Sequence, residues 1–159
     1  MEFHLSDVKC IFRYLIGTPN LGLCFKREKT YKLLGYCDAD FDGDRVERKS
    51  TSGGCHFIGG CLVSWTSQKQ GTITLSTVEA KYISGASCCS QLLRIKHQLE
   101  DYNMFENKIP ILCDNNVAID LSKKPIIHLC AKHIDIKHHF IRDHVQKDTV
   151  ELQFVSIKD

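Results

Sequence analysis

The sequence lacks the features of a membrane protein or a secreted protein. No apolar run approaches the roughly 18 residues that a membrane-spanning helix needs. No signal peptide is visible at the N-terminus, because Asp7 and Lys9 interrupt its only short apolar stretch. Internal repeats and low-complexity tracts are missing as well. We therefore expect 159 residues to form one domain with a sizeable core, in the cytoplasm or nucleus and without a membrane partner.

The chain also has little net charge. A formal charge of +2 argues neither for nor against a nucleic-acid partner, so any basic surface must be local. Cysteine, in contrast, is abundant: nine residues, an odd number, several of them inside apolar runs. A free thiol in such a run behaves as a small hydrophobe, whereas a disulfide framework favours an even count. The cysteines therefore predict a reduced, intracellular protein.

A zinc site is an alternative for the histidine-rich segment near the C-terminus. Its candidate ligands are His128, Cys130, His133, His138, His139 and His144. The spacing of His133 and His144 is not that of a helical metal pair, and no C-x-x-C pair accompanies them. We prefer an amphipathic helix with His138 over the core. A zinc-dependent binding protein remains the alternative, and stoichiometric metal in the purified protein is its test.

Apolar periodicity and turn residues predict an alternation of strands and helices. Gly59-Gly60 indicates a two-residue hairpin, and Ser76 with Glu79 forms an S-x-x-E capping box at the start of a long helix. The polar residues 41–52 are expected to form a loop. The expected strands are 33–39, 54–58, 61–66, 72–75, 109–113 and 150–155, with an extended segment at 21–26. The expected helices are 7–16 (capped by Ser6), 76–102, 115–121 and 131–146. This order describes a mixed sheet with helices packed on it, preceded by an appendage of about 30 residues.

Three short segments carry acidic residues at positions suited to a common site. Tyr36-Cys37-Asp38-Ala39-Asp40 and Leu112-Cys113-Asp114-Asn115-Asn116 each end an apolar strand pattern, and Ser76-Thr77-Val78-Glu79-Ala80-Lys81-Tyr82 opens the long helix. Carboxylates from strand ends and a helix start can converge, and converging carboxylates are what a divalent-cation site requires. On spacing alone, turn residues explain the two aspartates more readily. The order of the segments and the sequence around them favour the divalent-cation site.

Together with their flanks, these segments resemble the ribonuclease H domain of copia-type LTR retrotransposon Pol polyproteins. The consecutive blocks are GYCDADFDGD, RKSTSGG, LVSWTSQKQ, LSTVEAKY, CDNNVAI and KHIDIKHHFIRDHV, and HLSDVKCIFRYLIGTPNLGL before them resembles the end of the reverse transcriptase. The resemblance implies an α/β ribonuclease H-like fold, with a mixed five-stranded sheet flanked by helices, over residues 31–159. It also implies that residues 1–30 are a remnant of the reverse transcriptase or connection segment.

The resemblance further implies an ancestral activity, the cleavage of RNA in RNA–DNA hybrids with two Mg²⁺ ions. Asp38 and Asp114 then correspond to metal-binding catalytic carboxylates. Glu79 corresponds to the first glutamate of the motif S-T-x-E-A-E-Y. We expect the second glutamate to face the metals, and Lys81 stands at that position. Two residues along a helix rotate a side chain by about 200°, so Glu79 is a poor substitute.

A second departure is that the family's fourth carboxylate, on a helix beyond the last strand, has no counterpart up to Asp159. Activity is therefore expected to be impaired, and a non-catalytic module that binds nucleic acid or protein is the alternative. The expected partners are an RNA–DNA hybrid and the reverse transcriptase domain of the parent polyprotein. The expected phosphate contacts are Arg45, Arg48, Lys49, Lys132, Lys137 and Arg142, although solvated loops and faces explain these charges about as well.

Overall fold

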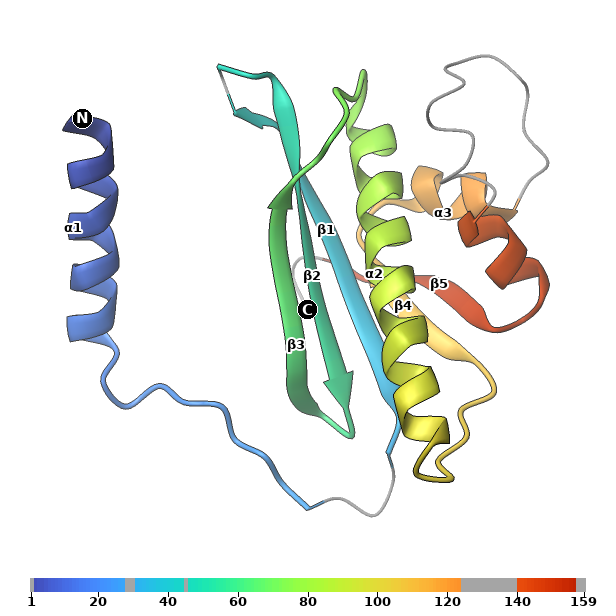
Figure 1. Ribbon diagram of the computed structural model, residues 1–159. Helices are drawn as coiled ribbons and strands as arrows, with labels where there is room; N and C mark the ends of the chain where they lie inside the picture. Colours follow the sequence, from blue (N-terminus) through green and yellow to red (C-terminus); the bar gives the residue numbers. More distant parts are fainter. Residues whose placement is uncertain (1, 28–30, 45, 124–139, 157–159) are drawn as a thin grey trace.

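The computed structural model describes residues 2–27, 31–44, 46–123 and 140–156, and its centre is a five-stranded mixed sheet of order β3-β2-β1-β4-β5 (Figure 1). The strands are β1 (Leu33–Asp44), β2 (Lys49–Ile58), β3 (Cys61–Lys69), β4 (Ile109–Cys113) and β5 (Val150–Phe154). The first three strands pair antiparallel, and β4 and β5 continue the sheet in parallel with β1. The predicted mixed sheet is confirmed.

The helices are α1 (Glu2–Gly17), α2 (Thr77–Glu100) and α3 (Asn116–Lys123), and residues 140–146 are also helical. Helix α2 lies across one face of the sheet, while α1 stands apart from it in Figure 1. The apolar side chains of α1, such as Ile11, Phe12 and Leu15, are exposed. None of the helices in the described part of the chain is both long enough and apolar enough to cross a membrane.

Helix α2 approaches the sheet closely because glycine occupies the contact on β1. Leu33, Gly35 and Cys37 are buried at alternate positions of β1, on one face of the strand. A Cβ at Gly35 would lie 2.6 Å from Cδ1 of Leu92, which is fully buried on α2. A larger residue at position 35 would therefore require the Leu92 side chain or the helix to shift. This close packing fixes the height and rotation of α2, and so the position of the residues in its first turns.

The N-terminus of α2 is capped by its own sequence. The Ser76 Oγ accepts a hydrogen bond from the Glu79 backbone N–H at 3.2 Å. The Glu79 carboxylate accepts one from the Leu75 N–H at 2.7 Å, one residue before the N–H that the usual capping box predicts. These bonds satisfy N–H groups that have no partner at a helix start, and they fix where α2 begins.

Replacing Ser76 with alanine is expected to lower the free energy of unfolding by about 1 kcal/mol, because the cap hydrogen bond is lost. Urea unfolding followed by circular dichroism measures the change. Ser87→Ala is the matched control, since Ser87 is exposed in the interior of the same helix. Equal stability of the two variants would show that the Ser76 cap contributes nothing.

Several predicted boundaries are wrong, and backbone pairing explains the main ones. Residues 41–44 and 49–52 are strand rather than loop: after an irregular stretch between Asp40 and Asp44, β1 pairs with β2 again at Asp44–Lys49, so strand pairing overrides the polar composition. For the same reason β3 extends to Lys69. Residues 72–75 form no strand. Helix α1 begins at Glu2, which places Ser6 inside it rather than at its cap. Of the predicted 131–146 helix, residues 131–139 lie outside the described residues.

Candidate active site

The two aspartates expected to share a site lie close together at two neighbouring inner strands of the sheet. Strands β1 and β4 are parallel neighbours, and Cys37 pairs with Cys113 in their register. Asp38 and Asp114 each follow that pair by one residue: Asp114 lies just past the end of β4, whereas Asp38 lies within β1 and pairs with Gly53 rather than ending its strand. The expected placement on adjacent strands, with α2 nearby, is confirmed.

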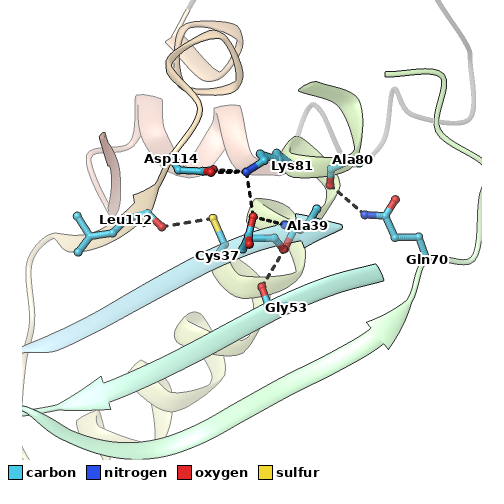
Figure 2. Close-up of polar contacts among 10 residues, drawn as sticks. Cys37, Ala39, Gly53, Gln70, Ala80, Lys81, Leu112 and Asp114 are labelled. Carbon is cyan, nitrogen blue, oxygen red and sulfur yellow. Dashed lines mark hydrogen bonds and ion pairs between the residues drawn. The ribbon is translucent and has the colours of Figure 1, made fainter. Parts of the chain in front are cut away.

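Lys81 occupies the space between these two carboxylates. Its Nζ donates a hydrogen bond to Oδ1 of Asp38 at 2.9 Å and contacts both carboxylate oxygens of Asp114. Figure 2 shows the Lys81 side chain pointing at Asp114. The Lys81 and Asp114 side chains are 16% and 15% exposed, whereas that of Asp38 is 73% exposed. The pair with Asp114 is thus largely buried, and the contact with Asp38 is open to solvent.

The charges of this cluster shift the pKa values of its members. Burial alone raises the pKa of Asp38, but hydrogen bonds from Lys81 and from the Ala39 N–H, with the Lys81 charge, outweigh burial, and the net pKa is lowered. Burial likewise opposes the charged form of Lys81. Its hydrogen bonds to Asp114 and Asp38 outweigh that effect and raise its pKa. The lysine is therefore held as an ammonium ion between two acids.

These directions predict how pH acts on the cluster. The lowered pKa of Asp38 contributes stability that is present above its ordinary value of 3.8 and is lost as pH falls through the folded value. The raised pKa of Lys81 contributes stability that is present below its ordinary value of 10.5 and is lost as pH rises through the folded value. We expect a carbon-13 NMR titration of the Asp38 carboxyl group to have its midpoint below 3.8. In Lys81→Met that midpoint should rise. An unchanged midpoint would mean that the two groups do not interact in solution.

Glu79 lies outside this cluster. Its carboxylate bonds to the backbone N–H of Leu75 in the helix cap, and the rotation of α2 turns it away from the face that carries Lys81. The structure thus brings together Asp38, Asp114 and Lys81, and places Glu79 at the cap.

Two side chains that sequence reasoning missed hold the first turns of α2 against the sheet. Ser84, one turn after Lys81, donates from Oγ to the carbonyl oxygens of Asp38 and, at 3.0 Å, Gly53. Gln70 donates from Nε2 to Ser52 Oγ at 2.8 Å and to the Ala80 carbonyl at 2.9 Å, as Figure 2 shows for Ala80. Both residues are buried. In the sequence, the only sign of these contacts is that Ser84 is a polar residue on an apolar helix face.

Two cysteines, Cys37 and Cys113, immediately precede the two aspartates of the cluster in the sequence. The Cys37 thiol donates to the Leu112 carbonyl at 3.6 Å and is hydrogen-bonded to the Cys113 thiol. That hydrogen bond raises the pKa of Cys37 well above its usual value, together with burial, and it lowers the pKa of Cys113.

The expected phosphate-binding residues are spread over several elements. Arg48 and Lys49 lie at the β1–β2 connection, where Lys49 pairs with Glu47 at 2.7 Å. Arg142 lies in the 140–146 helix and is half-buried, and its Nε has no hydrogen-bond partner among the described residues. Its charge acts on Tyr82, where burial still raises the pKa of the hydroxyl to about 12. Arg45, Lys132 and Lys137 lie outside the described residues.

The donor set limits which metals the described residues could hold. No group of three or more histidine, cysteine, aspartate or glutamate side chains within 2–27, 31–44, 46–123 and 140–156 is arranged to hold a metal ion. Of the residues considered for zinc, only His144 lies in these ranges. The third side chain beside Asp38 and Asp114 is the Lys81 ammonium, a cation rather than a carboxylate.

Comparisons with known proteins identify relatives of this chain. The chain is 36% identical over 156 residues to the retrovirus-related Pol polyprotein of transposon TNT 1-94 from Nicotiana tabacum, with 98% of the chain covered. It is 38% identical over 159 residues to that of transposon RE1 from Arabidopsis thaliana, with 99% covered. The chain spans only 12% and 11% of the lengths of these two relatives. No family model matches the chain.

Solved structures agree on the fold. The N-terminal RNase H domain of a Mycobacterium tuberculosis protein superposes with a TM-score of 0.57 at 10% identity, covering 81% of this chain and 85% of that one. LC11-RNase H1, solved in complex with an RNA/DNA hybrid, superposes with a TM-score of 0.55 at 12% identity, covering 80% of this chain and 87% of that one. The chain is therefore homologous to a segment of the retrovirus-related Pol polyproteins of plant transposons, and it has a ribonuclease H-like fold.

Proposed function

We propose that this chain is a ribonuclease H-like domain that binds RNA–DNA hybrids but whose metal-dependent cleavage is impaired. One observation carries the proposal: the Lys81 ammonium lies between Asp38 and Asp114, in hydrogen-bond contact with both. Two-metal hydrolysis of a phosphodiester needs carboxylates that are free to bind Mg²⁺ at that place. In this chain those oxygens are engaged by a cation.

The residues present do not fit a pair of Mg²⁺ ions. Magnesium requires oxygen ligands in near-octahedral geometry and tolerates little distortion. Here an ammonium offers no lone pair, repels a second cation and uses the Asp114 oxygens that a metal would need. Displacing Lys81 would leave its charge without its buried partner, which adds to the cost of metal binding. The ancestral two-metal reaction is therefore not expected to run at this site.

Hybrid binding rests on different groups. Phosphate contacts position a protein on a nucleic acid and do not require the metals. For this role we propose Arg48 and Lys49, at the β1–β2 connection, together with Arg45, Lys132, Lys137 and Arg142. The hybrid bound to LC11-RNase H1 supports the choice of partner by fold. In the parent polyprotein, residues 31–159 would form this domain and residues 1–30 would belong to the reverse transcriptase side.

The test measures cleavage and binding on the same sample of the 159-residue protein. We expect little or no Mg²⁺- or Mn²⁺-dependent cleavage of a labelled RNA–DNA hybrid, together with binding whose affinity falls with salt. A double variant, Arg48→Gln with Lys49→Gln, should weaken binding and reduce the salt slope by about 2, because roughly one counterion is released per phosphate contact. Glu47→Gln is the matched control, since it removes the partner of Lys49 but no positive charge.

Two results would overturn the proposal. Efficient Mg²⁺-dependent cleavage that Asp38→Asn abolishes would show a working enzyme. A chain that neither cuts nor binds the hybrid would favour the alternative, a module that keeps only a protein partner.

A further inference from the structure

Cys37 and Cys113 form a pair of thiols across two neighbouring strands. They are register partners on the parallel strands β1 and β4, and their side chains point to the same face of the sheet. Their residues are 5% and 2% exposed. Figure 2 shows the Cys37 sulfur turned toward β4, at the Leu112 carbonyl.

We propose that Cys37 and Cys113 are a reversible disulfide site, oxidised by hydrogen peroxide. One thiol loses its proton and its sulfur attacks a peroxide oxygen. The O–O bond breaks, and the departing hydroxide takes up the proton as water, which leaves a sulfenic acid. The second thiol attacks that sulfur, the S–O bond breaks and a second water leaves. Two thiols are thereby oxidised to one disulfide, and one peroxide is reduced to two waters.

The geometry matches what a disulfide requires. Neighbouring strands lie about 4.7–4.9 Å apart, and bridged cysteines have Cα atoms roughly 4.4–6.8 Å apart. The nearest competitor is Cys88, but its thiol is directed at the Tyr36 carbonyl at 3.6 Å. Cys89 follows it on the same helix and points about 100° away. Cys113, its register partner, is therefore the expected disulfide partner of Cys37.

The location gives the bond a consequence. Cys37 and Cys113 each precede one of the two clustered aspartates by one residue. A covalent bond between them would fix the separation of β1 and β4 next to the two aspartates that Lys81 contacts. Both thiols are buried, so peroxide is expected to oxidise them more slowly than the exposed thiols of Cys10 and Cys24. This inference does not depend on whether the domain binds or cuts a hybrid.

The test is a peroxide titration of the folded chain. Free thiols are blocked in denaturant and the peptides are analysed by mass spectrometry, with and without a reducing agent. We expect a reducible peptide pair linking Cys37 to Cys113, with two of the nine thiols lost per chain. A background with Cys10→Ser and Cys24→Ser removes the two thiols that are exposed within the described residues, which otherwise react first.

Variants then check the assignment. The linked pair should disappear in Cys37→Ser and persist in Cys55→Ser, the matched control on β2. Circular dichroism reports whether each variant folds, and the mapping in the unaltered chain stands even if Cys37→Ser does not. The proposal is overturned if Cys37 and Cys113 stay alkylated while other thiols oxidise. It is also overturned if Cys113 is found linked to Cys88.

Discussion

Replacing Lys81 with glutamate is expected to raise Mg²⁺-dependent cleavage of an RNA–DNA hybrid by about a hundredfold over the unaltered chain. The change removes the ammonium that binds Asp38 and Asp114 and supplies a third carboxylate at the same position on α2. A gain of about 2.7 kcal/mol in transition-state stabilisation corresponds to that factor, and metal-site electrostatics are of this size. Single-turnover cleavage of a labelled hybrid is the measurement.

Two further variants separate ligand supply from charge removal. Lys81→Gln removes the ammonium without adding a carboxylate, and we expect it to cut far more slowly than Lys81→Glu. Adding Asp38→Asn to Lys81→Glu should return cleavage to background, because that carboxylate would then be lost. If Lys81→Glu folds and binds hybrid but cuts no faster than the unaltered chain, the lysine is not what impairs the site.

The second large effect concerns stability. Asp114→Ala is expected to lower the free energy of unfolding by about 3 kcal/mol, because it leaves the largely buried Lys81 ammonium without its closest partner. Asp38→Ala should cost at most about 1 kcal/mol, because its contact with Lys81 is exposed to solvent. Urea denaturation at neutral pH compares the two variants directly.

A paired replacement tests the same reasoning. Lys81→Met with Asp114→Leu removes both charges and keeps apolar volume, so it should recover most of the stability lost in Asp114→Ala. Equal costs for Asp38→Ala and Asp114→Ala would mean that the buried and exposed contacts do not differ as the structure indicates.

Local chemistry made part of this fold predictable. Gly59 and Gly60 have positive φ values of 54° and 80°, which is the backbone that a two-residue hairpin turn requires. Strand β4 coincides with its predicted range of 109–113, because an apolar run of five residues between polar neighbours has few alternatives. The capping box located the start of α2, and with it the position of Lys81.

Features that depend on distant partners were not predictable. Asp44 is the end of β1 because it pairs with Lys49 of β2, and no local preference for a strand indicated it. The same limit applies to Ser84 and Gln70, whose hydrogen bonds join segments far apart in the sequence. The site was inferred from Asp38 and Asp114 with their surrounding blocks, whereas the contact of Lys81 with both carboxylates is a property of the folded chain.

The most direct test of the central claim is whether a divalent ion enters the site at all. Mn²⁺ broadens the NMR signals of nuclei close to it, so a titration can follow the backbone amides of Asp38 and Asp114 in the unaltered chain and in Lys81→Glu. We predict that these two amides broaden in Lys81→Glu at Mn²⁺ concentrations that leave them sharp in the unaltered chain. Equal broadening in both proteins would contradict the account, because it would show that Lys81 does not keep the metal out.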